Sequence, residues 1–156
     1  MTERLYEHYV QYYETDKMGI VHHSNYIRFF EEGRVHFLDR LGISFHMMEE
    51  EGVGSPVLDI DCEFKSGAKF ADVLIVYCRL TKYNGIRLRF EYEIVNKLNG
   101  KLHACGNSGH CFVDLKTHHP IALQKTHPEL NEKIVRAIER GNPPSLDSIK
   151  QKTEFV

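Results

Sequence analysis

Apolar and polar side chains alternate along several stretches of the chain, which is the pattern of strands that bury one face. We predict five strands, over residues 5–12, 57–64, 72–80, 86–95 and 102–113. Asn84-Gly85 and Asn99-Gly100 separate the last three, and Asn-Gly is the strongest short signal for a hairpin turn. The last three strands should therefore form an antiparallel meander.

Between the first two strands, apolar residues recur at the spacing of a helix. The predicted helix starts at a Ser24 or Asn25 cap and ends before Gly42. Its apolar surface is wider than one stripe, so the helix should be buried on several sides. Gly33 costs about 1 kcal/mol of helix propensity relative to alanine, and close approach of another backbone would explain it. Shorter helical patterns cover residues 44–51 and 128–139.

The predicted order is one strand, a long buried helix, four strands and a terminal helix. An antiparallel sheet curled around a single helix would bury that helix, which is an α+β arrangement. The 156 residues suit one domain. We expect a core over residues 5–116, a C-terminal helix over residues 128–139 and a polar tail over residues 145–156.

Composition and charge narrow the function classes. With a net charge of −2, the chain lacks the broad positive field that non-specific nucleic-acid binding needs. No apolar run approaches the roughly 20 residues that span a bilayer, and the first residues do not form a signal peptide. The four cysteines include no Cys-x-x-Cys pair, which favours free thiols and a cytoplasmic protein. The ten histidines lack the spacing of metal ligands, so no metal site is expected.

The segment between the first strand and the central helix has no periodic pattern but carries chemically capable residues. Backbone N–H groups at a helix start lack partners and carry partial positive charge, so they can stabilise an oxyanion. Gly19 lets the loop fold back, and the Asp16 carboxylate could then attack a carbonyl held there or activate water. The same residues also fit structural roles at a turn, a helix entrance or the core: Asp16, His22, His23, Asn25 and Tyr26.

A motif in this segment resembles the signature of the 4-hydroxybenzoyl-CoA thioesterase family: Asp16-x-x-Gly19-x-Val21-x-His23-x-Asn25-Tyr26-x-Arg28-Phe29-Phe30-Glu31. It is most similar to the branch of small bacterial acyl-CoA thioesterases. Two later segments also look like that branch: Phe70-Ala71-Asp72 and Gly106-x-x-x-His110-x-Phe112-Val113-Asp114. The resemblance implies a hotdog fold, an antiparallel five-stranded sheet wrapped around one long central helix.

The resemblance also implies a thioester hydrolase that releases a free acid and coenzyme A from an acyl-CoA, without a cofactor. Asp16 matches the catalytic aspartate, acting as nucleophile or general base, and the backbone N–H of His23 matches the oxyanion donor. Asn25 and Tyr26 match positions that shape the loop and the helix entrance. Three further residues of the motif are assigned to the substrate-binding site: Gly19, Val21 and His22. His22 stands where relatives often have an aromatic residue, which leaves the acyl group open.

Coenzyme A carries several phosphates, whereas the chain is net acidic, so the cations that bind it must be local. Candidates lie near predicted strand ends or turns: Lys65, Lys82 and Arg87, followed by Lys69 and Lys101. A solvated surface position would explain each of them as well.

In similar proteins two subunits join their sheets edge to edge, so we expect a homodimer or homotetramer with the site between subunits. Acyl carrier protein is an alternative carrier of the acyl group. Two other function classes stay open: a non-catalytic binder of acyl thioesters or acyl carrier protein, and a hotdog dehydratase. A pure binder needs no carboxylate beside a thioester, so Asp16 favours hydrolysis.

Overall fold

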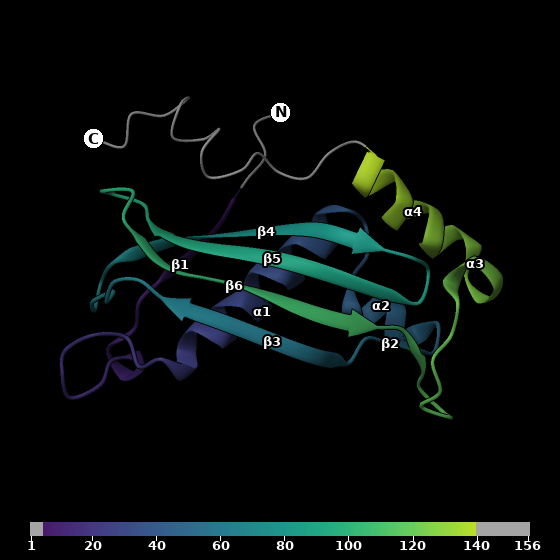
Figure 1. Cartoon of the computed structure of the whole chain (residues 1–156), viewed down its shortest axis with the longest axis horizontal. Coiled ribbons are helices and arrows are strands. Elements are labelled where there is room, and N and C mark those ends of the chain that lie inside the picture. Colours follow the sequence, from purple (N-terminus) through teal and green to yellow (C-terminus); the bar gives the residue numbers. More distant parts are fainter. Residues whose placement is uncertain (1–4, 140–156) are drawn as a thin grey trace.

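The computed structural model describes residues 5–139, and its main sheet has five strands. They are β1 (Tyr6–Tyr9), β3 (Val57–Phe64), β4 (Val73–Tyr83), β5 (Arg87–Asn96) and β6 (Leu102–Cys111). All neighbours pair antiparallel in the order β1-β4-β5-β6-β3. The sheet curls over helix α1 (Ser24–Arg40), as Figure 1 shows. This is the predicted α+β plan, including the meander of β4, β5 and β6.

The remaining elements are short and lie around this core. They are the 3-10 turn η1 (Tyr12–Glu14), α2 (Phe45–Glu50), β2 (Val53–Gly54), β7 (Val113–Asp114), α3 (Leu123–Thr126) and α4 (Pro128–Glu139). The sequence analysis did not predict the β2–β7 pair or α3. The expected tail over residues 145–156 lies outside the described residues. None of the helices between residues 5 and 139 is long and apolar enough to cross a membrane.

Helix α1 is buried because aromatic side chains on it pack against the concave face of the sheet. The ring of Phe30 stacks on that of Tyr92 in β5, with the centroids 4.5 Å apart. A Cβ atom on Gly33 would lie 2.5 Å from Cγ1 of Val76 in β4. Strand β4 therefore approaches Gly33 closely, but with the Val76 side chain rather than with the predicted backbone.

Several predicted boundaries are wrong where tertiary contacts decide them. The first strand ends at Tyr9 and not at residue 12, because the chain turns away from the sheet after Val10 donates to the carbonyl of Asp72. The cap of α1 is His23, so neither Ser24 nor Asn25 holds that position. The last predicted strand is interrupted after Cys111 and resumes as β7.

Strand β3 forms one edge of the sheet, pairing with β6 on one side only. Three of its apolar side chains are about half exposed: Val57 at 48%, Leu58 at 49% and Phe64 at 54%. An exposed apolar edge of this kind offers both backbone hydrogen bonds and hydrophobic area to another strand.

Candidate active site

The Asp16 loop, residues 15–21, closes on itself at one end of the sheet, beside the start of α1 (Figure 1). Thr15 and Val21 form an antiparallel bridge at its base. Inside the loop, Asp16 N–H donates to the carbonyl of Ile20 at 2.8 Å, and Gly19 N–H donates to the carbonyl of Asp16 at 3.0 Å. Gly19 has a φ of +80°, which only glycine adopts without strain, so the predicted fold-back at this residue is confirmed.

The Asp16 side chain is partly buried and turned back over its own loop. Its Oδ1 accepts the Met18 backbone N–H at 2.8 Å, which fixes the orientation of the carboxylate. Within residues 5–139, no donor bonds to its Oδ2. One oxygen is therefore used for positioning, and the other is available for chemistry.

At the start of α1, one backbone donor has no partner within residues 5–139. The N–H groups of His22 and Asn25 donate to the carbonyls of Glu14 and His22, at 2.8 and 2.9 Å. The Ser24 N–H is directed at Nδ1 of the His22 ring, at 3.2 Å. The N–H of His23 has no acceptor in the described part of the chain. It is the amide that the sequence motif assigns to the oxyanion.

An open pocket of about 300 Å³ lies between the Asp16 loop and the start of α1. Five of the predicted site residues line it: Asp16, Val21, His23, Tyr26 and Lys65. The Tyr26 hydroxyl accepts the N–H of Ala68 at 3.4 Å, and burial raises the pKa of Tyr26, so its phenol stays protonated. Lys65 forms an ion pair with Glu63 at 2.7 Å, at the rim of the pocket.

Three other predicted residues adjoin the pocket without being part of its wall. The ring of His22 is exposed and stacks on that of His23, with the centroids 4.2 Å apart. Gly19 shapes the loop, as described above. Asn25 is buried, and its side-chain amide donates to the Glu14 carbonyl at 2.8 Å, so it holds the loop on the helix.

Lys82 and Arg87 lie elsewhere. They line a second pocket, also of about 300 Å³, together with Leu58 and His110. Leu58 and Phe64 are near opposite ends of β3, which at about 3.3 Å per residue separates the two pockets by about 20 Å. Within one subunit, neither cation shares the pocket of Asp16.

The sequence analysis missed Glu14, which organises this region. Its side chain is buried, at 6% exposure, and Oε1 accepts the Gln11 N–H at 2.7 Å. Its carbonyl accepts both the His22 N–H and the Asn25 side chain. The signal was the Gln11-x-x-Glu14 spacing, which resembles a capping box at a helix start.

Comparison with known proteins identifies the family. A model of the thioesterase-like superfamily matches residues 10–141. The chain belongs to this superfamily. Relatives that it shares this family with are named as acyl-CoA thioesterases or thioester hydrolases, so the chain is a thioester hydrolase, as predicted.

The individual relatives agree with this family membership. "Putative acyl-CoA thioesterase YneP" of Bacillus subtilis is 37% identical over 120 residues, covering 77% of this chain and 86% of that protein. Acyl-CoA thioester hydrolase YbgC of Escherichia coli is 31% identical over 117 residues, covering 75% and 87%. The structure of DHNA-CoA thioesterase from Staphylococcus aureus superimposes with a TM-score of 0.81 and 32% identity, covering 87% of this chain and 92% of that one. The hotdog fold of this thioester hydrolase is thereby confirmed.

Proposed function

We propose that the chain hydrolyses an acyl-CoA thioester to a free acid and coenzyme A, with Asp16 and the backbone N–H of His23 as the reacting and stabilising groups. The observation that carries the proposal is their common position. Both residues line the pocket at the start of α1, and within residues 5–139 nothing bonds to the Oδ2 of Asp16 or to the N–H of His23.

This arrangement supplies two catalytic effects. The His23 N–H and the positive end of the helix stabilise the oxyanion that forms on the thioester carbonyl, and loss of such a donor typically costs roughly 10²- to 10³-fold in rate. As a general base, Asp16 removes a proton from the water that attacks the carbonyl carbon. As a nucleophile, its Oδ2 attacks directly and forms a mixed anhydride that water cleaves. In both routes the C–S bond breaks and the coenzyme leaves as a thiolate that takes up a proton.

A single turnover in ¹⁸O-labelled water distinguishes the two routes. Label found only in the released acid shows that water attacked the acyl carbonyl carbon, as general-base catalysis requires. If Asp16 is the nucleophile and water cleaves the anhydride at the aspartyl carbonyl, label enters the Asp16 carboxylate. Mass spectrometry of the peptide that contains Asp16 measures this.

The wall of the pocket supports an apolar acyl group. Half of its ten lining residues have apolar or aromatic side chains: Met18, Ile20, Val21, Tyr26 and Phe64. The relative from Staphylococcus aureus is named for DHNA-CoA. We therefore propose an aromatic acyl-CoA as the first substrate to test, with short- and medium-chain acyl-CoAs and acyl carrier protein thioesters in the same panel.

Thiol release from this panel tests the function. Asp16→Asn should lower kcat by roughly 10²- to 10⁴-fold, because it removes the base or nucleophile while the amide oxygen still accepts the Met18 N–H. Lys17→Gln, a change at the exposed neighbouring position, is the matched control and should keep full activity. Binding of acyl-CoA without thiol release would favour the non-catalytic binder, and water loss from a 3-hydroxyacyl thioester would favour a dehydratase.

The proposal includes a second subunit that pairs its β3 with the β3 of the first. A two-fold antiparallel pairing of this edge would bring the Phe64 end of one strand against the Val57 end of the other. The pocket with Lys82 and Arg87 would then adjoin the Asp16 pocket of the partner subunit. These cations could bind the phosphates of coenzyme A there, which one subunit alone cannot arrange.

Subunit mixing tests this pairing. Asp16→Asn and Arg87→Glu chains should each be weakly active, the second through a raised KM for acyl-CoA. When they are unfolded together and refolded as a mixture, about a quarter of the sites should combine an intact Asp16 with an intact Arg87. Activity that exceeds the sum of the separate variants supports a shared site. A monomer in light scattering, or no gain on mixing, would contradict it.

A further inference from the structure

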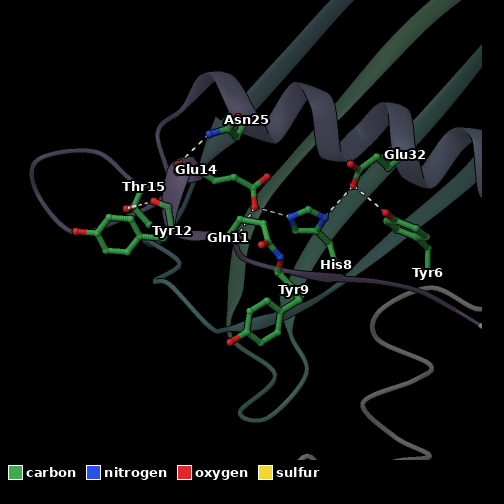
Figure 2. A network of polar contacts seen from close by, with 9 residues as sticks. All are labelled: Tyr6, His8, Tyr9, Gln11, Tyr12, Glu14, Thr15, Asn25 and Glu32. Carbon is green, nitrogen blue, oxygen red and sulfur yellow. Dashed lines mark hydrogen bonds and ion pairs between the residues drawn. The ribbon is translucent and has the colours of Figure 1, made fainter.

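His8 lies between two carboxylates that come from different elements (Figure 2). From its place in β1, its Nε2 is 2.7 Å from Oε1 of Glu14 in η1. Its Nδ1 is 3.0 Å from Oε2 of Glu32 in α1. The Tyr6 hydroxyl donates to the same Glu32 oxygen at 2.8 Å. One imidazole ring therefore connects the turn before the Asp16 loop to the central helix.

The geometry defines the charge of His8. A carboxylate only accepts hydrogen bonds, and a neutral imidazole has one N–H, so contacts of both ring nitrogens with carboxylates favour the form in which both nitrogens carry hydrogen. Burial by itself would lower the pKa of His8, but its hydrogen bonds to Glu32 and Glu14 outweigh this and raise the pKa above its ordinary value. The pKa of Glu32 is lowered by its hydrogen bond with His8 and, to a smaller extent, by its hydrogen bond with Tyr6. The three groups form a carboxylate–imidazolium–carboxylate bridge.

Within residues 5–139, Glu14 and Glu32 are the charged groups that shift the pKa of His8. The ring of Phe29 in α1 packs against the imidazole, with the centroids 4.2 Å apart, and Leu74 of β4 lies opposite it in the sheet. Tyr6 reaches the bridge through Glu32, and behind it the ring of His36 packs at 5.5 Å from that of Tyr6. The titratable groups that face His8 are thus Glu14, Glu32 and the more distant Tyr6.

One end of the bridge is Glu14, which also holds the Asp16 loop against the start of α1. The Glu14 carbonyl accepts the His22 N–H and the Asn25 amide, each at 2.8 Å, and Asp16 follows two residues later. Moving the Glu14 side chain would therefore shift Asp16 relative to the unused N–H of His23. The Glu32 end is fixed, because it projects from the middle of a 17-residue helix.

We infer that His8 is a positioning residue of the thioesterase site, which as an imidazolium between Glu14 and Glu32 holds the Asp16 loop in place against helix α1. The inference rests on the proposed function of Asp16. When His8 loses its proton, one ring nitrogen turns a lone pair toward a carboxylate, and that side of the bridge becomes repulsive. Thiol release should therefore fall on the alkaline side of the His8 titration.

His8→Gln tests the inference, because glutamine offers one donor and one acceptor but no charge. A displacement of this size near the reacting groups should lower kcat by roughly ten- to a hundredfold, with KM changed less than threefold, and should abolish the alkaline fall in kcat. His46→Gln is the control: His46 pairs with Glu50 at 3.1 Å, but its side chain is 82% exposed on α2. It should leave kcat and the pH profile unchanged.

A second readout is independent of turnover. The N–H groups of Asp16 and Gly19 are bonded within the loop, and that of Val21 ties the loop to the carbonyl of Ala68. Hydrogen exchange of these three amides should accelerate at least tenfold in His8→Gln and not in His46→Gln. Glu32→Gln alters only the partner on the helix and should show the same effects more weakly. The double variant should be no worse than His8→Gln, because both changes break one bridge.

The possible failures are distinguishable. If the unmodified protein releases no thiol, the proposed function fails, and the exchange data alone decide whether His8 holds the loop. If thiol release occurs but His8→Gln leaves kcat, the pH profile and the loop exchange unchanged, the inference is overturned. A fall in kcat without faster exchange in the loop would also overturn it, because His8 would then act by another route.

Discussion

His8 and His110 are both largely enclosed by protein, yet their surroundings favour opposite charge states. His8 contacts two carboxylates, which favour its protonated form. His110 is 1% exposed, and burial, with Arg34 nearby, lowers its pKa to about 4. Burial is common to the two residues, so the sign of the neighbouring charge decides whether a buried histidine is an ion or a neutral hydrogen-bonding group.

The two clusters also differ in their neighbours. The His110 cluster is a chain of hydrogen bonds through the core: Arg34 donates to the Tyr92 hydroxyl at 3.0 Å, and the Ser108 hydroxyl is 2.6 Å from both the Tyr92 hydroxyl and Nε2 of His110. It joins α1 to β5 and β6. The His8 cluster joins α1 to a loop. The first should therefore govern global stability, and the second should govern the geometry of the site.

The largest stability effect should come from Tyr92→Phe. This change removes the acceptor of the buried Arg34 guanidinium and should lower the free energy of unfolding by about 2–3 kcal/mol. Tyr83→Phe, which removes a hydroxyl bonded to Asn131 on α4, is the matched control and should cost about 1 kcal/mol. Urea unfolding measures both. If Tyr92→Phe also accelerated hydrogen exchange in the Asp16 loop, the two clusters would not have separate roles.

The loss of stability at acidic pH should depend on the protonation of His110. Its pKa is about 4 in the folded protein and near 6.5 once unfolded, so between these values the unfolded chain binds more protons. Stability should be lost as pH falls through this window, by roughly 2 kcal/mol. His110→Gln should flatten that slope in unfolding experiments from pH 7 to 4. An unchanged slope would show that carboxylates alone cause the loss.

The loss of stability at alkaline pH should depend on the deprotonation of His8, and this effect should be smaller. Because its folded pKa is raised, its stabilising contribution is complete below about pH 6.5 and is lost as pH rises through the folded pKa. Screening by solvent limits this contribution to about 1 kcal/mol. The stability lost in His8→Gln should thus be larger at pH 6 than at pH 9. A constant difference at both pH values would mean that His8 contributes packing rather than charge.

Much of the fold was predictable because local patterns and tertiary packing agree. The bounds of β3 and α4 match the predicted residues 57–64 and 128–139, since alternation and a proline at the helix start act within each segment. The end of β1 was not predictable. Tyr12 continues the alternation of the strand, but the Glu14 carboxylate caps Gln11 and turns the chain away.

The candidate site divides in the same way. The motif from Asp16 to Tyr26 is continuous in sequence, so its members could be predicted to lie together, and Asp16, Val21, His23 and Tyr26 share one pocket. Lys82 and Arg87 could not be placed from the sequence, because strand ends at the two opposite ends of a sheet look alike in a linear pattern.

The sequence by itself determined the strand–helix order, the hairpin turns, the buried central helix and the thioesterase motif, because periodicity and short-range spacing encode them. Only the tertiary structure showed that Glu14 holds the loop and that His8 lies between the carboxylates of Glu14 and Glu32. These residues come from a strand, a turn and a helix. Whether a histidine keeps its proton depends on which carboxylates folding brings beside it, and no local pattern contains that information.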